Sequence, residues 1–385
     1  MPHKELMVGN KAVAYGAKLA RVEVASAYPI TPQTTIVQYL AEFVAQGEMN
    51  MKFIEVESEI SAQISVQGAS FAGARVFTAT SGPGLHYMHH PMMGCQRPIV
   101  MAVVHRGVKS MEPDHTDLMS QRDKGWIHLY CEDSQEVLDT MIMAYKIAEH
   151  KDVHLPVAIG LDGYILSYTS EPVEIPDQED VDKFLPPFKP DYSLAEPLPY
   201  GEWVKAGGAR LYGSQKAWIQ HHDIINGSKK IIQQVDEEYG KMFGRSYGGG
   251  LFEEYKCEDA EAVIIAMGTI ASTARVAISE LQEEGYPVGL IKLKTFRPFP
   301  GEELCEAAKK YKAIGVIDRN VCLGSGGVVF NELRGAIYDL DPKPKVLGFH
   351  TGMAGEEVTP AKIKHIAKKT LRSTKEKVDQ VVEWV

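Results

Sequence analysis

The sequence has 385 residues, of which 44% are apolar and 24% are charged, and its formal net charge is −10. This length is sufficient for two domains with separate cores, and the composition is that of an ordinary globular protein. An acidic balance with no basic run argues against nucleic acid or an anionic membrane as a partner. No stretch reaches the roughly 18 uninterrupted apolar residues of a membrane span. Residues 1–9 lack the apolar core of a signal peptide, so a cytoplasmic location is expected.

The five cysteines lie far apart and form no CxxC pair: Cys95, Cys131, Cys257, Cys305 and Cys322. This spacing is typical of reduced thiols and excludes a local iron–sulfur or zinc motif. Any electron-carrying cluster that serves this protein is therefore expected on another chain.

Residues 1–170 alternate short apolar runs with segments of helical periodicity, which predicts an α/β fold with a doubly wound parallel sheet. The expected strands are 22–27, 52–56, 75–80, 99–104 and 157–160, and the expected helices are 10–19, 35–46, 60–71 and 134–149. Thr34 and Thr35 are expected to cap a helix that begins near Ile36. The run 82–84, Gly-Pro-Gly, is expected to end the third strand and to open the next helix.

Seven prolines fall within residues 171–200, which predicts an extended connector. Residues 201–250 hold aromatic and glycine-rich stretches and one amphipathic helix near 228–242. The segment 171–250 is therefore expected to join two domains and to wrap a neighbouring domain or subunit.

A second, smaller α/β unit is expected over residues 251–385. Its expected strands are 263–267, 288–293, 313–317 and 345–349, and its expected helices are 273–284 and a tail from 360. The turn at Gly268 has the form of an anion cradle at a helix N-terminus, but a tight turn alone is the favoured interpretation.

The stretch 27–35, AYPITPQTT, follows the first expected strand. Its two prolines hold the backbone extended and prevent the strand from running directly into a helix. The result is a stiff loop at the carboxyl end of a strand, where open α/β sheets bind ligands. Thr31 lies at its tip with a free hydroxyl group. Taken alone, the stretch is better explained as a rigid strand-to-helix connection.

Further stretches accompany this loop in a fixed order: FIEVESE at 53–59, FTATSGPG at 77–84, DHTD at 114–117, RDKGW at 122–126, TIA at 269–271, FRPFP at 296–300, DRN at 318–320 and GSGG at 324–327. In this order and spacing the chain resembles the α subunit of 2-oxoacid:ferredoxin oxidoreductases, the pyruvate-type enzymes that use thiamine diphosphate. The resemblance covers most of the chain except about 171–250. It implies a pyrimidine-binding thiamine diphosphate domain at 1–170 and a transketolase C-terminal-like α/β domain at 251–385.

The resemblance also implies an activity. Such a subunit takes part in the oxidative decarboxylation of a 2-oxoacid with coenzyme A, which yields an acyl-CoA, CO₂ and low-potential electrons for ferredoxin or a similar acceptor. The alternatives are a non-oxidative thiamine diphosphate enzyme subunit and a catalytically inactive scaffold subunit. Pyruvate, 2-oxoisovalerate and phenylglyoxylate all remain open as substrates.

The thiamine diphosphate enzymes hold the pyrophosphate through Mg²⁺ with a GDG motif, which this chain lacks. The nearest match, 161–163 (LDG), is missing the first glycine. By resemblance, a partner subunit is expected to supply the pyrophosphate and Mg²⁺ side of the cofactor site. Iron–sulfur clusters are expected on other subunits of the same hetero-oligomer. No metal site is expected in this chain.

Three carboxylates, Glu55, Glu57 and Glu59, lie close together and share one face if the second strand continues to Glu59. Glu59 stands where the next helix opens. A glutamate whose pKa is raised in an apolar pocket is suited to share a proton with the pyrimidine ring of the cofactor. The alternative role is stabilisation of the helix dipole. The resemblance implies that Glu59 is the activating glutamate.

By resemblance, Thr31 hydrogen-bonds the substrate, and Tyr28 and Pro29 flank the cofactor ring. Thr80 and Ser81, at the end of the third strand, are likewise expected to contact the cofactor.

Arg106 matches the arginine that binds the substrate carboxylate, a role in which bidentate geometry favours arginine. The loop from Arg106 to Asp114 is shorter than in the pyruvate enzymes, and Lys109 within it is a second cation for the same carboxylate. The shortening predicts a pocket that admits a bulkier 2-oxoacid.

Three histidines, His86, His89 and His90, have helical spacing, but no acidic or cysteine ligand accompanies them in sequence. Packing or hydrogen-bonding roles are therefore favoured over a metal site. Asp114 and His115 are expected to fix the substrate loop by hydrogen bonds rather than to act as a base.

Overall fold

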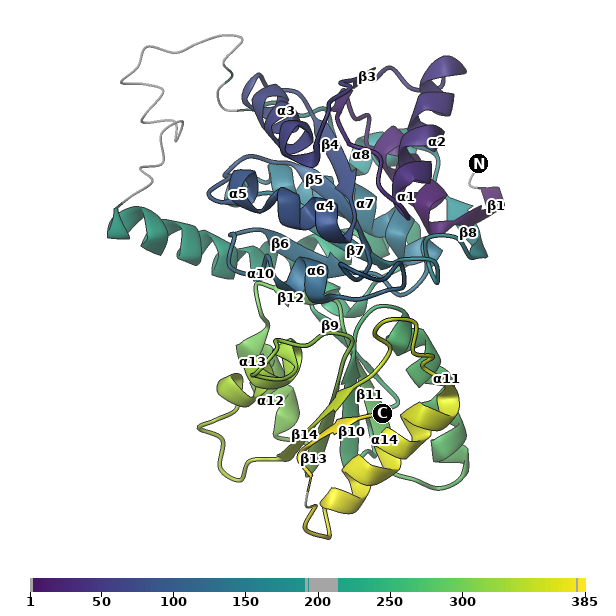
Figure 1. Ribbon diagram of the computed structural model, residues 1–385, viewed down its shortest axis with the longest axis vertical. Coiled ribbons are helices and arrows are strands. Elements are labelled where there is room, and N and C mark those ends of the chain that lie inside the picture. The colour runs from purple at the N-terminus through teal and green to yellow at the C-terminus, as the bar shows by residue number, and fades with distance from the viewer. Residues whose placement is uncertain (1–2, 191–192, 194–213, 379) are drawn as a thin grey trace.

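The computed structural model describes residues 3–190, 193, 214–378 and 380–385. Two α/β units are joined by a long helix, and each is built on its own sheet (Figure 1). The part of the expected connector and arm at 191–192 and 194–213 lies outside the described residues.

The first sheet has the strand order β12-β6-β7-β5-β4-β2-β3, and every neighbouring pair is parallel except β12 with β6. Its strands are β2 (Val24–Ala25), β3 (Lys52–Phe53), β4 (Val76–Thr80), β5 (Val100–His105), β6 (Ile127–Tyr130), β7 (Val157–Asp162) and β12 (Thr295–Arg297). The doubly wound parallel sheet predicted from the sequence is therefore confirmed.

Helices cover both faces of this sheet (Figure 1). They are α1 (Gly9–Leu19), α2 (Thr34–Ala45) and α7 (Ser134–Glu149) on one face, and α3 (Glu59–Phe71), α4 (Gly82–Tyr87) and α5 (His89–Met92) on the other. Along β5, Val100, Ala102 and Val104 pack on the first set, whereas Met101 and Val103 pack on the second. This alternation makes the strand apolar throughout, as expected of a parallel strand that is buried on both faces.

Some boundaries differ from the expectation. β3 ends at Phe53, so the expected strand 52–56 is shorter and strand alternation does not reach Glu59. The helix expected near Ile36 begins at Thr34, and no side chain caps it. The capping role expected of the two threonines is therefore wrong, because the Thr35 hydroxyl instead accepts a hydrogen bond of 2.7 Å from Asn10 Nδ2.

The first part of the expected connector forms regular structure. β8 (Ser170–Ile175) pairs antiparallel with β1 (His3–Val8), and α8 (Gln178–Phe184) follows. Pro172 is accommodated because this ribbon has only two strands, so each is an edge strand.

The predicted arm helix is α10 (Gln215–Phe243), which begins well before the expected residue 228. Its C-terminal half buries Ile232, Val235 and Tyr239 in the core shared with α7 and α8. The N-terminal half extends beyond the sheet (Figure 1), and Trp218 there is 64% exposed. The described part of the arm therefore packs against its own α/β unit.

The second sheet has the order β15-β14-β13-β10-β11-β9, in which only β9 runs antiparallel to its neighbour. Its strands are β9 (Phe252–Tyr255), β10 (Ala262–Ala266), β11 (Val288–Leu293), β13 (Ala313–Asp318), β14 (Lys345–His350) and β15 (Val382–Trp384). Helices α11 (Thr269–Glu283) and α14 (Pro360–Ser373) cover one face, and α12 (Gly301–Ala308) and α13 (Val328–Ala336) the other (Figure 1). A 3₁₀ turn, η1 (Gly248–Gly250), precedes β9.

A buried charge cluster joins the two units. Glu136 in α7 accepts hydrogen bonds from Lys292 Nζ at 2.7 Å and Lys294 Nζ at 2.6 Å. Burial alone would raise the pKa of Glu136, but the two ammonium groups lower that pKa to about 2. All three side chains are almost fully buried, and the attraction between the carboxylate and the two lysines offsets the cost of removing the charges from water.

A second buried cluster surrounds Asp162, at the end of β7. Its carboxylate lies 2.6 Å from His115 Nε2 and accepts hydrogen bonds from Thr269 N at 2.9 Å and Arg319 NH1 at 2.8 Å. Burial opposes ionisation, but Arg319 and His115 hold the pKa of Asp162 well below its usual range. The turn at Gly268 is therefore more than a tight turn: its helix N-terminus receives an anion, and that anion is a carboxylate of the same chain.

Candidate active site

The loops at the carboxyl ends of β2, β3, β4 and β5 meet at one edge of the first sheet. β2 and β4 are neighbours, yet the chain leaves β2 towards the β3 edge and leaves β4 towards β5. Such a reversal of direction opens a crevice at the strand ends, the usual ligand position in open α/β sheets. Thr31, Glu59, Ser81 and Arg106 all follow these strands.

The Thr31 loop is fixed from two sides. Asn10 Nδ2 in α1 donates to the Pro32 carbonyl at 2.7 Å, and Arg106 NH1 donates to the Thr31 carbonyl at 2.8 Å. Thr31 is half-buried, whereas Tyr28 and Pro29 are exposed at the rim. The structure therefore brings Thr31 and Arg106 into direct contact.

Glu59 differs from the two carboxylates that precede it. It is 8% exposed and opens α3, whereas Glu55 and Glu57 are exposed. Glu57 hydrogen-bonds the Ser61 hydroxyl. No described residue donates a hydrogen bond to the Glu59 carboxylate.

The 80–84 loop fits closely against Glu59. A Cβ at Gly84 would lie 2.6 Å from Glu59 Oε1 and 2.5 Å from Thr80 Oγ1, so only glycine leaves room for the two side chains. The hydroxyls of Thr80 and Ser81 are buried and have no hydrogen-bond partner among the described residues. The Glu59 carboxylate, which has no donor among the described residues, and the unsatisfied Thr80 hydroxyl therefore meet at Gly84. Buried polar groups without a partner are rare unless a ligand completes them.

Arg106 lies against the same loop. Gly82 has a φ of +32°, and a Cβ there would lie 2.7 Å from Arg106 Cγ. The short loop beyond Arg106 exposes two apolar side chains, Val108 (55%) and Met111 (45%). Lys109 is exposed and makes no ion pair with the described residues, and its role as a second cation for the substrate carboxylate stays a prediction.

Asp117 is a residue to which the sequence analysis gave no role. Its carboxylate accepts hydrogen bonds from the backbone N–H of Gly82 and of Arg106, both at 3.2 Å. The DHTD stretch was the available signal, but roles were given only to Asp114 and His115. Those two make the expected hydrogen bonds: Asp114 accepts from Thr116 N at 2.8 Å, and His115 contacts Asp162.

The three clustered histidines do not converge. His89 Nδ1 lies 2.8 Å from Gln121 Oε1, and His86 Nδ1 lies 3.3 Å from the Ser120 hydroxyl. Within the described ranges, no three His, Cys, Asp or Glu side chains are arranged to hold a metal ion.

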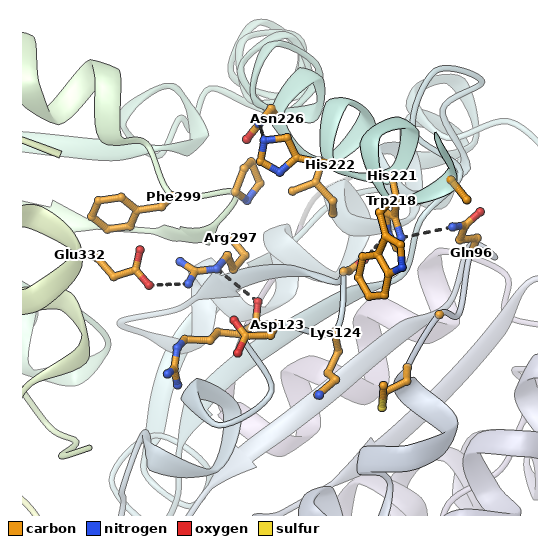
Figure 2. A pocket seen from close by; sticks show the side chains of 17 residues that line it. Gln96, Asp123, Lys124, Trp218, His221, His222, Asn226, Arg297, Phe299 and Glu332 are labelled. Carbon is orange, nitrogen blue, oxygen red and sulfur yellow. Dashed lines mark hydrogen bonds and ion pairs between the residues drawn. The ribbon is translucent and has the colours of Figure 1, made fainter. Parts of the chain in front are cut away.

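A cavity of about 510 Å³ lies away from this edge (Figure 2). Residues 93–96 and 122–125 line it before the start of β5 and β6, so it stands at the amino ends of the strands. Figure 2 shows Trp218 of α10 on one side and Arg297, which pairs with Glu332, on the other. None of the predicted site residues lines this cavity, which marks the junction of the arm helix with both units.

A cavity of about 500 Å³ lies at the carboxyl edge, between the two units. Glu112 and Pro113 of the short loop line it, together with Tyr164, Thr269 and Arg319. The loop after Arg106 therefore borders both the first sheet and the second unit.

Two family models match the chain. Residues 15–239 match the thiamine diphosphate-binding domain of pyruvate flavodoxin/ferredoxin oxidoreductase, and residues 260–363 match core domain II of pyruvate:ferredoxin oxidoreductase. The chain belongs to the pyruvate:ferredoxin oxidoreductase family. The family predicted from the sequence motifs is thereby confirmed.

Curated relatives in this family match the chain over nearly its whole length. Pyruvate synthase subunit PorA of Methanothermobacter thermautotrophicus is 42% identical, over 99% of this chain and 97% of its own. Ketoisovalerate oxidoreductase subunit VorA of Pyrococcus horikoshii is 43% identical, over 100% of this chain and 98% of its own. Both of these relatives are named as subunits of an enzyme.

Solved structures share the fold. The 2-oxoglutarate:ferredoxin oxidoreductase of Magnetococcus marinus, with 2-oxoglutarate, coenzyme A and succinyl-CoA bound, has a TM-score of 0.69 at 22% identity, over 96% of this chain and 65% of that one. A split-gene transketolase, an inactive β4 tetramer, has a TM-score of 0.55 at 15% identity, over 94% of this chain and 98% of that one. These neighbours confirm the predicted fold class. In the part of the chain that is described, every helix is too short or too polar to cross a bilayer.

Proposed function

We propose that this chain is the subunit of a 2-oxoacid:ferredoxin oxidoreductase that binds the pyrimidine side of thiamine diphosphate and the 2-oxoacid. The complete enzyme converts a 2-oxoacid and coenzyme A into an acyl-CoA and CO₂, and two electrons pass to ferredoxin. The observation that carries the proposal is Glu59, a buried residue whose carboxylate has no donor among the described residues and lies against Gly84, beside the unsatisfied Thr80 hydroxyl.

The residues at the sheet edge fit the cofactor. The Thr80 and Ser81 hydroxyls and the Glu59 carboxylate can hydrogen-bond the polar edge of an aminopyrimidine, and Gly84 allows a ring to approach the backbone. Bound thiamine diphosphate supplies a carbanion at C2 that adds to the carbonyl carbon of a 2-oxoacid. The protein has to bind, orient and move protons around that reaction.

Glu59 holds the proton that the pyrimidine ring nitrogen needs. Its place at the first residue of α3, on the buried side of the turn, aims the carboxyl group at the 80–84 loop. A carboxyl group held at hydrogen-bond distance from a ring nitrogen can share a proton with it.

Arg106 and Thr31 bind the substrate. The guanidinium group takes the carboxylate of the 2-oxoacid, and the Thr31 hydroxyl donates to its carbonyl oxygen without bringing a charge to the reacting carbon. Because Arg106 NH1 also donates to the Thr31 carbonyl, the two binding groups stand at a fixed separation.

A partner subunit covers this edge and supplies the pyrophosphate and Mg²⁺ site, which the missing GDG motif leaves without ligands in this chain. Exposed apolar side chains gather on the loops of the same edge, namely Tyr28, Val108, Met111, Tyr164 and Ile165. Exposed apolar side chains that gather on one face are typical of a protein interface. Iron–sulfur clusters on further subunits, and ferredoxin, then carry the electrons away.

The substrate is a 2-oxoacid with a small aliphatic side chain. The relatives named for pyruvate and for ketoisovalerate are almost equally similar to this chain, so the choice depends on the pocket itself. The short loop offers Val108 and Met111, both apolar, to the substituent of the substrate. The non-oxidative and inactive alternatives receive no support from these relatives.

The test is an anaerobic assay of the purified native complex, with a viologen as electron acceptor. We expect oxidation of 2-oxoacids that depends on coenzyme A and is lost in the Glu59→Gln variant. The isolated chain, given only thiamine diphosphate and Mg²⁺, is expected to be inactive. A native complex that oxidises no 2-oxoacid would overturn the proposal. Turnover by the isolated chain would show that no partner subunit is needed to complete the cofactor site.

A further inference from the structure

Asp117 is a buried carboxylate with four donors around it. Oδ2 accepts from the N–H groups of Gly82 and Arg106, each at 3.2 Å. Oδ1 lies 2.7 Å from His105 Nδ1 and accepts from Leu118 N at 2.6 Å. The residue is 1% exposed. One carboxylate of α6 (Thr116–Met119) therefore joins the loop at Gly82 to the end of β5.

Two of these segments carry the groups proposed to bind the cofactor and the substrate. Gly82 belongs to the loop that faces Glu59, and Arg106 is the proposed carboxylate-binding residue. The two are in direct contact, since a Cβ at Gly82 would lie 2.7 Å from Arg106 Cγ. A shift of the carboxylate between them changes their separation, because both N–H groups bond the same oxygen atom.

The carboxylate is itself held in place. The ring of His105 stacks on Tyr130, with ring centroids 5.1 Å apart and an interplanar angle of 14°. Asp117 and His115 lie at the start of the short helix α6. The His115 N–H donates to the Arg319 carbonyl of the second unit at 2.9 Å. The position of Asp117 is therefore fixed by both α/β units.

We propose that Asp117 is a positioning residue of the 2-oxoacid site, which sets Arg106 relative to the cofactor loop through one shared carboxylate oxygen. This inference rests on the proposed function. Asp117 does not touch the substrate; it acts through the backbone of Arg106 and of Gly82. An asparagine cannot replace it, because the amide group turns one of its two ends from acceptor into donor. In Asp117→Asn, either the Gly82–Arg106 pair or the His105–Leu118 pair loses its acceptor.

The experiment uses the assembled complex in the anaerobic assay. Asp117→Asn is expected to raise KM for the 2-oxoacid by about 10–100-fold, the effect of a small displacement of a binding group, and to leave KM for coenzyme A unchanged. Asp139→Asn is the matched control. Asp139 is equally buried and accepts hydrogen bonds from Tyr239 and Tyr247, but it anchors the arm helix. This variant should lower stability without a change in either KM.

A double variant tests whether Asp117 acts through Arg106. If it does, Arg106→Ala with Asp117→Asn should lower kcat/KM no further than Arg106→Ala alone. Multiplicative losses, or an Asp117→Asn enzyme whose KM for the 2-oxoacid is unchanged, would overturn the inference. If Asp117→Asn does not assemble, Asp117→Glu is measured in its place: it keeps both acceptor oxygens but moves them by one methylene group, and it must raise the same KM. Failure of the proposed function is distinct, since the unaltered complex would then oxidise no 2-oxoacid.

Discussion

Two buried glutamates stand in the first turns of helices, but their surroundings are opposite. Glu136 in α7 is fully buried and is bound by two lysines from the second unit. Glu59 in α3 is nearly as buried, and no described residue donates to its carboxylate. A buried charge costs free energy unless it is paired, so the first arrangement stabilises the junction and the second leaves a carboxylate available. What distinguishes the carboxylate of the candidate site from the structural one is therefore the absence of a hydrogen-bond donor among the described residues, and not the degree of burial.

The sharpest test of this contrast is Glu59→Gln. The amide keeps the shape of the side chain and removes the shared proton, so we expect exchange of the cofactor C2 proton to slow by about 10²–10⁴-fold. Deuterium exchange in the assembled complex measures it. Glu57→Gln, two residues away and exposed, is the control and should exchange at the unaltered rate. An unaltered rate in Glu59→Gln would reduce Glu59 to a helix-stabilising residue.

Glu136→Gln should have the opposite profile. Removal of the Glu136 charge leaves Lys294 without its counter-ion and leaves Lys292 with only Glu132, at 3.6 Å. Breaking such a buried pair costs about 3–5 kcal/mol. Urea unfolding should show this loss, while folded enzyme keeps its KM for the 2-oxoacid. Glu238→Gln removes an exposed ion pair with Lys146 and should cost less than about 1 kcal/mol. Equal losses in the two variants would contradict the comparison.

The same glutamate predicts a pH dependence. The folded-state pKa of Glu136 is about 2, below the ordinary value of 4.5. Its stabilisation is therefore complete above about pH 4.5 and is lost as the pH falls towards 2. At 1.36 kcal/mol per pKa unit, the loss amounts to about 3 kcal/mol. Unfolding free energies of the unaltered and Glu136→Gln proteins should converge over this range; parallel curves would show that the carboxylate is not strongly paired.

Arg106→Lys should weaken substrate binding without affecting stability. A lysine keeps the charge but loses the bidentate grip, so KM for every 2-oxoacid should rise by about tenfold. Steady-state kinetics of the assembled complex measures the change. If KM rises for some 2-oxoacids and not for others, Arg106 contacts the variable substituent of the substrate rather than the carboxylate that all 2-oxoacids share.

The smallest expected effect is the choice among substrates. If the short loop enlarges the pocket, kcat/KM for 2-oxoisovalerate should exceed that for pyruvate. One methylene group changes such ratios by only about 10–200-fold, so pyruvate should remain a poor substrate rather than an excluded one. A preference for pyruvate above about tenfold would show that other residues fill the space.

The sequence was sufficient to predict the fold class because its strands are buried on both faces. Runs such as 99–104 and 313–317 are apolar throughout, which is distinctive even without periodicity. Edge elements were not predictable in this way. β12 has three residues and is a strand only because it pairs with β6, far away in sequence. Of the long helix α10, the amphipathic pattern predicted only the part near 228–242, and the part from Gln215 onwards was missed.

The sequence predicted those site residues that stand in short motifs. Thr31, Glu59 and Arg106 stand in motifs, and the structure places them along one sheet edge. Asp117 and Asp162 were out of reach because their roles depend on partners 35 and 107 residues away. The role of a polar residue inside a sequence motif cannot be predicted when its hydrogen-bond donors come from distant parts of the chain.

The loop that follows Arg106 has consequences for how this enzyme acquires new substrates. Its ends are fixed, by Asp117 on the first unit and by the Arg319 carbonyl on the second, while Val108 and Met111 in its middle are exposed. Substitutions in an exposed loop between rigid supports cost little stability. Substrate preference can therefore diverge through a few changes at the centre of this loop, with the chemistry at Glu59 and the assembly of the two units left intact.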